Sequence, residues 1–419
     1  MSDGPPTTRL RVTALNFFPA FVPPTSGGEL RYYHVYKNLG RYYRIDLISL
    51  THQAGDVVQV ADQVVEHRVS KTWRHELLQR WLARIGRFPE CSAMVVSLAS
   101  YAEKGYQAVV RERCSEADVV VHEFPFLFRH ARKRPGQLLV YDAHNVEFDL
   151  QRTMLRGPLG ALLSRYTRWL ESLACRESDV VFATSADDRR RLIELYRVAP
   201  DKVFVAPNGV DVSAVRATTD SERKDARRRL GVEGEDVLLF VGSFHPPNLE
   251  AVECLVGTLA PRLPDALFLI AGGAVAAVEP SRLPTNVARL GRVSDEAKTL
   301  LLRAADVALN PMFSGSGTNL KTLEYLAAGL PVVTTPAGAR GLGLTSGRHA
   351  IVCPVEDFPA EIARVLRDDG LRAMLGAQGR RLVEETYDWT TIADAMHAVI
   401  ESALAGMAAD PRPSRRRKG

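Results

Sequence analysis

The 419 residues exceed the size at which one hydrophobic core keeps growing, so we expect two domains of roughly 200 residues each. A hydrophobic fraction of 46%, a mean hydropathy of −0.10 and the lack of any apolar run near ~18 residues favour a soluble protein over one that spans a bilayer. The formal charge of +5 equals that of five basic residues at the C-terminus, so the body of the chain is neutral and gives no indication of a nucleic-acid partner.

The chain begins without the apolar segment of a signal peptide, which predicts a cytoplasmic protein. A strand pattern from Leu10 to Phe21 leads into Ser26, Gly27 and Gly28, and a helical pattern follows. The unpaired N–H groups at the start of such a helix can hold a phosphate, although an ordinary turn explains two adjacent glycines equally well.

Two further strand patterns, Arg44 to Leu50 and Val64 to Ser70, precede an amphipathic helical segment. Its apolar stripe comprises Trp73, Leu77, Trp81 and Ile85, and the arginines around it are Arg74, Arg80, Arg84 and Arg87. A helix of this composition can lie in a membrane surface. The simpler interpretation, which we prefer at this point, is a helix that covers the core of its own domain.

Polar clusters follow the next two strand patterns. Asp118 to His122 is followed by Glu123 and Pro125, and Gln137 to Tyr141 is followed by a cluster that includes Asp142, His144, Asn145 and Glu147. Ligands of open α/β sheets gather at the carboxyl ends of strands, so these side chains are candidates for a site. A histidine that only forms structural hydrogen bonds is the alternative.

A helix near Leu159 to Ser178, a strand at 179–185, a helix through Arg197 and a strand at 203–211 complete the first half. The charged stretch from Val212 to Asp236 has no strand pattern and marks the domain boundary. Strand patterns at 237–243, 267–273, 287–293 and 306–312 then alternate with helices from Asn248 and Ser294. This alternation predicts parallel α/β layers in both halves.

The stretch from Ser314 to Thr335 reads as a glycine-rich loop, a short helix and a buried strand. Gly315 and Gly317 let the backbone approach a ligand, and Thr318 or Asn319 can cap the helix. Lys321 in the first turn adds a positive charge for a phosphate, and Glu324 can accept hydrogen bonds from a diol. The alternative is a turn before a core helix, with Lys321 and Glu324 as a surface pair.

Several classes of site are excluded by missing motifs. The chain has no third glycine for a dinucleotide fingerprint after GSGTNL, and no GxxxxGK[ST], HExxH or CxxC. Five well-separated cysteines indicate reduced, mostly buried thiols without a disulfide framework or a zinc site.

Taken together, the ordered motifs resemble those of GT-B glycosyltransferases of the retaining family 4 type. The motifs are SGG at Ser26–Gly28, VHEFP at Val121–Pro125, DAHNVE at Asp142–Glu147, PNGVD at Pro207–Asp211, VGSFHPPN at Val241–Asn248, AGG at Ala271–Gly273, LGRV at Leu290–Val293 and the loop with Lys321 and Glu324. The resemblance implies two Rossmann-like parallel-sheet domains facing across a cleft. The expected parts are an acceptor domain (1–212), a donor domain (213–386), a C-terminal helix that crosses back to the first domain (387–407) and a disordered basic tail (408–419).

The resemblance also implies transfer of a sugar from a nucleoside diphosphate sugar to an acceptor hydroxyl with retention, without a cofactor or a required metal. It assigns catalysis to His122 and Lys321 and acceptor binding to Glu123, His144 and Asn145. The donor-binding residues would be Gly27, Gly28, Ser243, His245, Arg292, Ser316, Gly317, Thr318, Asn319, Leu320, Lys321 and Glu324. Ser316 stands where the family normally has an acidic residue, and His245 stands in place of a basic pair.

The implied acceptors are sugars, lipid-linked sugars or small molecules, as in polysaccharide, glycolipid or natural-product glycosylation. The expected location is the cytoplasm, with peripheral contact at the inner face of the membrane. A non-catalytic GT-B protein that binds a nucleotide or supports a partner enzyme, and a nucleotide-sugar epimerase on the same fold, are the competing hypotheses.

Overall fold

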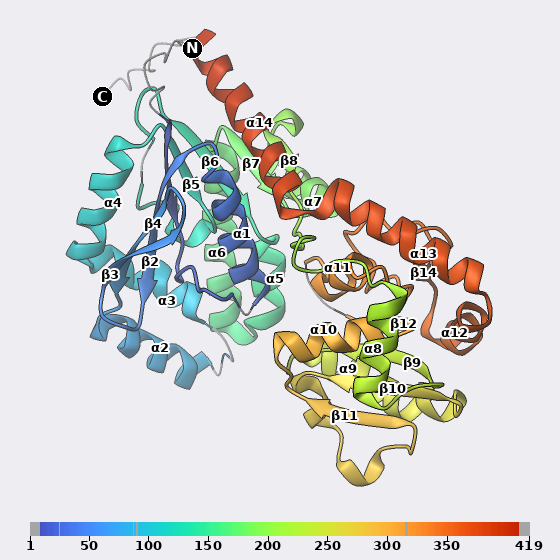
Figure 1. The fold of residues 1–419 in the computed structure, drawn as a ribbon. Coiled ribbons are helices and arrows are strands. Elements are labelled where there is room, and N and C mark those ends of the chain that lie inside the picture. Colours follow the sequence, from blue (N-terminus) through green and yellow to red (C-terminus); the bar gives the residue numbers. More distant parts are fainter. Residues whose placement is uncertain are drawn as a thin grey trace, which may run out of the picture. The chain divides into compact units, whose positions relative to one another are not determined.

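The computed structural model describes residues 9–24, 26–86, 88, 91–131, 133–314 and 317–409. The chain divides into two compact units, and Figure 1 follows their elements in order. Unit 1 comprises Met1–Pro207 and Ile392–Gly419, and unit 2 comprises Asn208–Thr391. These borders lie within about five residues of those expected at 212 and 386. The residues from 410 to 419, which hold the basic tail, lie outside the described part.

Unit 1 contains an eight-stranded sheet in the order β3-β4-β2-β1-β5-β6-β7-β8. All neighbouring strands are parallel except β3 and β4, which form an antiparallel hairpin that the sequence patterns did not indicate. The strands are β1 Arg11–Leu15, β2 Arg44–Thr51, β3 Asp56–Ala61, β4 Val64–Ser70, β5 Val119–His122, β6 Leu138–Ala143, β7 Val180–Ala183 and β8 Val203–Val205.

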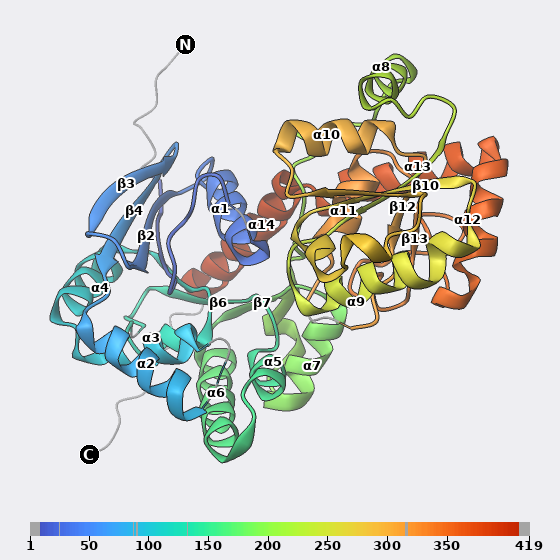
Figure 2. The same ribbon diagram turned by 90° about the horizontal axis from the view of Figure 1, so that it is seen from below.

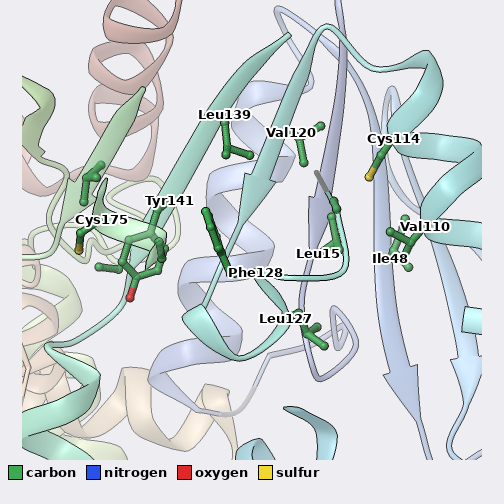
Figure 3. Packing of buried hydrophobic residues seen from close by; sticks show 14 of the residues in the cluster. Leu15, Ile48, Val110, Cys114, Val120, Leu127, Phe128, Leu139, Tyr141 and Cys175 are labelled. Atoms are coloured by element: carbon green, nitrogen blue, oxygen red, sulfur yellow. The ribbon is translucent and has the colours of Figure 1, made fainter. Parts of the chain in front are cut away.

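Helices cover both faces of this sheet, and Figure 2 shows α2, α3 and α6 side by side. The helices of unit 1 are α1 Gly27–Leu39, α2 Trp73–Gly86, α3 Ser92–Ala99, α4 Lys104–Glu116, α5 Glu147–Met154, α6 Gly157–Glu177 and α7 Ala186–Tyr196. Figure 3 shows the core on one face, where Leu15, Val120 and Leu139 point toward the side of Phe128 and α4. Helix α1 lies behind the strands in that view, on the other face.

The C-terminal helix α14, Trp389–Ala409, returns to unit 1 as the resemblance implied. Asp394 accepts a hydrogen bond from the Tyr42 hydroxyl at 2.9 Å, and the Tyr43 hydroxyl lies 2.8 Å from His397 Nδ1. By length and composition, α14 is the one described helix that could cross a membrane. Ile392, Ala393, Met396 and Ile400 on one side of this helix are buried, although only 22% of its apolar stretch is buried in all.

Unit 2 contains a six-stranded parallel sheet in the order β11-β10-β9-β12-β13-β14. The strands are β9 Asp236–Val241, β10 Ala266–Ala271, β11 Val287–Gly291, β12 Val307–Asn310, β13 Val332–Thr334 and β14 Ile351–Val352. The helices are α8 Asp220–Leu230, α9 Pro246–Cys254, α10 Asp295–Ala304, α11 Leu320–Ala327, α12 Phe358–Arg367 and α13 Asp369–Leu382. Along β9, Leu239 enters one core while Leu238 and Phe240 enter another, because successive side chains point to opposite faces.

Each sheet has a point where the order of strands reverses. In unit 1 the chain builds outward from β1 to β2 and then continues on the other side with β5, and in unit 2 it builds from β9 to β10 and continues with β12. Connections leave toward opposite faces there, which opens a crevice outside the carboxyl ends of the two strands. The structure therefore confirms the two parallel α/β domains and directs attention to the ends of β1 and β5 and of β9 and β12.

Candidate active site

In unit 1, a buried polar cluster lies at the carboxyl ends of β5 and β6. Glu123 directly follows β5, accepts a hydrogen bond from the Tyr36 hydroxyl of α1 and lies 2.8 Å from Nε2 of His144. Both Glu123 and His144 are buried. The structure thus brings two of the three predicted acceptor-binding residues into direct contact.

A fully buried ion pair supports this cluster from α1. The Arg31 guanidinium donates two hydrogen bonds to Asp142 at 2.5 and 3.0 Å. Its remaining Nη1 group donates to the backbone carbonyls of Ala206 and Pro207 at 2.9 and 3.0 Å. Since these partners come from another strand end and a loop, Arg31 fixes α1 against the carboxyl edge of the sheet.

Burial shifts the pKa values of Glu123 and His144 and so determines which of them is charged. Burial raises the pKa of Glu123 to about 7, against the opposing effects of the Tyr36 hydrogen bond and the Arg31 charge. Burial also lowers the pKa of His144 to about 3, so the imidazole is neutral. A neutral His144 that donates its Nε2 proton to Glu123 presents Nδ1 as a hydrogen-bond acceptor.

The predicted glycine turn lies beside this histidine. Ser26 caps α1 in a capping box with Glu29, so the helix begins at Gly27. A Cβ atom on Gly28 would lie 3.9 Å from His144 Nδ1 and 3.5 Å from the Phe18 ring. The first turn of α1 and the acceptor nitrogen of His144 therefore border the same space.

His122, the predicted catalytic histidine, points to the opposite face of the sheet from Glu123 because strand residues alternate. Its ring lies 4.8 Å from that of Phe128, and neither ring nitrogen has a hydrogen-bond partner among the described residues. Burial lowers the pKa of His122 to about 3. The sequence analysis grouped His122 with Glu123 after one strand and His144 with Asp142 after the next, whereas the structure pairs Glu123 with His144 and leaves His122 on the other face.

Asn145, the third predicted acceptor-binding residue, lies next to the cluster. Its side-chain amide donates to Glu147 at 3.2 Å. This contact holds the start of α5 and involves neither Glu123 nor His144.

In unit 2, Lys321 lies at the carboxyl ends of β9 and β12, the reversal point of the sheet. Its ammonium donates to the side-chain oxygen of Asn248, and it lies 4.5 Å from the centre of the Phe240 ring. Burial lowers the pKa of Lys321 to about 7. No carboxylate among the described residues pairs with Lys321, so the cation is uncompensated within unit 2.

Glu324 turns to a different helix. Its carboxylate accepts a hydrogen bond from Lys298 of α10 at 3.1 Å, and both side chains are partly exposed. The sequence analysis placed Lys321 and Glu324 on one side of α11, as phosphate and diol contacts or as a surface pair. Instead, Lys321 reaches α9 and Glu324 reaches α10.

The loop before α11 is half-buried. Gly317 has a φ of 69°, in the region that favours glycine. Asn319 is the N-cap residue, but its side chain makes no capping bond, contrary to one expectation, while Leu320 packs against the core. Thr318 Oγ1 has no partner in the described part of the chain. Ser316 lies outside the described residues.

A pocket of about 420 Å³ lies at the carboxyl ends of β10 and β11. The residues that line it are Phe244, Gly272, Gly273, Val275, Ala276, Arg289, Leu290, Gly291 and the predicted donor residue Arg292. Gly272 has a φ of 94°, and a Cβ atom there would lie 2.1 Å from the carbonyl oxygen of Gly242. Only glycine at position 272 allows the ends of β9 and β10 to approach so closely, and this approach shapes the floor of the pocket.

Asn248 links Lys321 to the loop that enters the pocket. Its side-chain amide donates to the carbonyl oxygen of Ser243 at 3.0 Å, and Phe244 of the pocket is the next residue. Ser243 and His245 are both exposed, and His245 is the N-cap of α9. The structure thus brings Ser243 and Lys321 together through Asn248, while Arg292 borders the neighbouring pocket.

Four residues of these sites were missed by the sequence analysis: Arg31, Tyr36, Asn248 and Lys298. Arg31 had a signal, since it lies in the buried stripe of α1 with Tyr32, Val35 and Tyr36, and a buried arginine needs an acidic partner. Asn248 and Lys298 had none, because their partners lie on other helices.

Comparisons with known proteins match one glycosyltransferase family model in each half of the chain. The family model described as Glycosyltransferase Family 4 matches residues 63–214, and the one described as Glycosyl transferases group 1 matches residues 235–368. A D-inositol 3-phosphate glycosyltransferase of Geodermatophilus obscurus is 33% identical over 259 residues, which are 57% of this chain and 56% of that protein. The chain spans 56–64% of the length of three curated relatives of this kind.

Solved structures share the fold over nearly the whole chain. Sucrose-phosphate synthase of Thermosynechococcus elongatus has a TM-score of 0.70 at 16% identity and covers 95% of this chain and 100% of its own. Anabaena HepE in complex with UDP-glucose has a TM-score of 0.65 at 16% identity, covering 94% and 100%.

Proposed function

Because the chain belongs to the GT-B glycosyltransferases, we propose that it transfers a sugar from a nucleoside diphosphate sugar to an acceptor hydroxyl with retention of the anomeric configuration. The observation that carries the proposal is Lys321, a partly buried cation without a carboxylate partner in the described chain. It stands at the first turn of α11 and at the reversal point of the sheet, where a diphosphate would supply the missing negative charge.

In this proposal the donor binds unit 2. The nucleoside base enters the pocket between Phe244 and Leu290, the ribose hydroxyls bond to Glu324, and the diphosphate lies against Lys321 and the start of α11. A hydrogen bond to a charged group contributes about 1.5–3 kcal/mol, while a helix terminus contributes about 0.3–1 kcal/mol. Lys321 and Glu324 therefore account for more of the donor affinity than the helix dipole does.

The likeness to the HepE structure with bound UDP-glucose supports a nucleoside diphosphate sugar as donor class. The donor sugar would lie near the loop that contains Ser316, with Gly317 and Thr318 at its described end. Arg292, Ser243 and His245 border the donor region as further phosphate or sugar contacts.

Catalysis in this proposal consists mainly of stabilising the departing diphosphate. Lys321 and the N–H groups at the start of α11 supply positive charge to the leaving oxygen, and the diphosphate in turn takes the proton of the acceptor hydroxyl. The reaction needs no metal ion. Glu123, Asp142 and His144 offer ligand atoms within 4.8 Å of one another, but Arg31 and Tyr36 already bond to the two carboxylates.

The acceptor would bind unit 1. Glu123 accepts hydrogen bonds from acceptor hydroxyls, and His144 Nδ1 orients the attacking hydroxyl beside Gly27 and Gly28. The resemblance to family 4 glycosyltransferases assigned the catalytic contact with the sugar or acceptor to His122. His144 is the better candidate because its ring borders the glycine turn, whereas the ring of His122 packs on Phe128.

The acceptor class comprises sugars, lipid-linked sugars and small molecules. The related D-inositol 3-phosphate glycosyltransferase carries a small polar acceptor in its name, which supports a hydroxyl-rich acceptor. We place the protein in the cytoplasm, in peripheral contact with the inner face of the membrane.

Donor turnover tests the function. The purified protein is incubated with UDP-, GDP- and ADP-sugars, and release of nucleoside diphosphate is measured with and without acceptor sugars. We expect hydrolysis of one donor, lost in Lys321→Met and insensitive to EDTA. Nucleotide binding without turnover would indicate the non-catalytic protein, and isomerisation of the donor without acceptor would indicate the epimerase.

A further inference from the structure

Helix α2 exposes its largest apolar side chains. Its outer stripe is exposed by 65% at Trp73, 56% at Leu77, 49% at Trp81 and 58% at Ile85. The inner face is formed by His75 and Leu82, which are buried, and by Leu78, which packs against the core. A helix that only covered its own core would turn its tryptophans inward, so the preferred interpretation of the sequence is wrong for this stripe.

Basic side chains lie among the exposed apolar ones. On a helical projection Arg74 and Arg84 fall within the arc of the stripe and Arg80 falls at its edge. The helix carries these three arginines against one acid, Glu76, which lies 3.6 Å from Arg80, and Arg74 also lies 3.8 Å from Glu103, which directly precedes α4. The guanidinium of Arg74 lies 5.4 Å from the Trp73 ring, so charge and apolar surface are interleaved.

We propose that this outer face of α2 docks on an anionic lipid bilayer. The face is one helix wide and about 21 Å long, which suits a helix lying flat in the headgroup layer. Tryptophan favours that depth because its ring is apolar and its N–H is polar, and the arginines there meet lipid phosphates.

A second copy of the chain fits this face less well. In a two-fold symmetric dimer the same patch meets itself, which would bring a face with three arginines, Arg74, Arg80 and Arg84, and one acid, Glu76, against an identical face. Such like charges repel, whereas a surface of phosphates attracts all three. Charge complementarity therefore favours the bilayer as the occupant.

The docking face shares a core with the proposed acceptor residues. Leu82 on the inner side of α2 belongs to the same buried cluster as Phe124 and Phe126. The Phe124 ring lies 4.2 Å from that of His144. Docking of α2 on a bilayer would thus place a lipid-borne acceptor close to Glu123 and His144. This consequence rests on the proposed function, but the docking itself is independent of it.

Co-sedimentation with vesicles tests the docking. Vesicles of phosphatidylcholine alone are compared with vesicles that also contain phosphatidylglycerol. We expect the protein to bind the mixed vesicles, Trp73→Ala with Trp81→Ala to lower the partition coefficient roughly tenfold, and Arg74→Gln with Arg84→Gln to remove the preference for the anionic lipid.

Matched controls separate the stripe from general apolar exposure. Trp169→Ala removes an exposed tryptophan that Arg129 covers on α6, and Val57→Ala removes an exposed apolar residue of β3. Both variants should bind vesicles as the wild type does. Equal vesicle binding by the α2 double variant would overturn the proposal, as would a dimer in size-exclusion chromatography that this variant converts to a monomer.

Two further measurements show whether a loss of vesicle binding comes from the missing apolar surface or from damage to the fold. The variant Trp73→Phe with Trp81→Phe keeps aromatic side chains on the stripe, so it should still sediment with vesicles while losing the blue shift of tryptophan emission that we expect of the wild type on vesicles. Donor hydrolysis without vesicles should be unchanged in the alanine double variant. If the wild type binds vesicles but hydrolyses no donor, the proposed function fails and the docking stands. If the wild type hydrolyses donor but does not bind vesicles, the docking proposal fails and the proposed function stands.

Discussion

The two candidate sites differ in how their buried charges are balanced. In unit 1 the cationic Arg31 meets the carboxylate of Asp142 and two backbone carbonyls, so the cluster is satisfied within the protein. In unit 2 the cation of Lys321 meets only an amide oxygen, a sulfur and an aromatic ring among the described residues. A satisfied charge stabilises the fold, whereas an uncompensated one is suited to a ligand of opposite charge.

The largest effect should follow from breaking the balanced pair. Arg31→Leu leaves Asp142 buried without its partner, so we expect a loss of about 3–5 kcal/mol in the free energy of unfolding, measured with urea. Arg41→Leu is the control, because its pair with Asp394 is half exposed and contributes less than about 1 kcal/mol. Equal losses in the two variants would refute the contrast.

The next effect concerns the two candidate histidines of unit 1, His144 and His122. His144→Ala should lower kcat by roughly 10²-fold with a smaller change in donor KM, because it removes the hydrogen bond that orients the acceptor. His122→Phe should retain most activity, since the ring packs on Phe128 and makes no hydrogen bond in the described chain. Single-turnover kinetics would decide, and the opposite order of effects would return the catalytic role to His122.

In unit 2, loss of the uncompensated charge should affect binding and spare the fold. Lys321→Met should weaken donor binding by about 1.5–3 kcal/mol, roughly 10- to 150-fold, in calorimetric titrations. The free energy of unfolding should stay the same or rise, because burial of an unpaired cation is unfavourable. A loss of stability as large as in Arg31→Leu would show that Lys321 is a structural residue.

Glu324 should have a more moderate role. Glu324→Ala should raise donor KM about tenfold by removing contacts with the ribose, with little change in kcat. Lys298→Ala serves as the matched variant, since it removes the same ion pair and keeps the carboxylate. If both variants raise KM equally, the pair and not the carboxylate matters.

The smallest effect is a dependence of donor affinity on pH. The pKa of Lys321 lies near 7 in the free protein, and an adjacent diphosphate raises it, so donor binding takes up a proton above pH 7. Affinity should therefore fall as pH rises from about 7 to 8, by up to about tenfold. Lys321→Arg should bind with little change over this range, because arginine stays protonated.

Much of the fold followed from local patterns. The apolar runs at Asp118 to His122 and at Gln137 to Tyr141 predicted β5 and β6, and Gly27 and Gly317 predicted the starts of α1 and α11. The hairpin strand β3 escaped notice because none of its residues is buried and the strand lacks the apolar run of a buried strand. The end of β5 shows what local patterns miss. His122 and Glu123 are neighbours in sequence, but their side chains lie on opposite faces of the sheet.

Local sequence patterns were enough to predict where polar residues follow strands, where helices begin and which helix has an apolar stripe, since these features depend on neighbours a few residues apart. The partners of the buried charges depend on the folded chain: Arg31 pairs with Asp142, 111 residues away, and Lys321 with Asn248, 73 residues away. The tertiary structure also decided that the tryptophan stripe of α2 faces outward, because His75 and Leu82 already fill the inner face. Contacts between distant segments fix which charges are balanced, and no local pattern contains them.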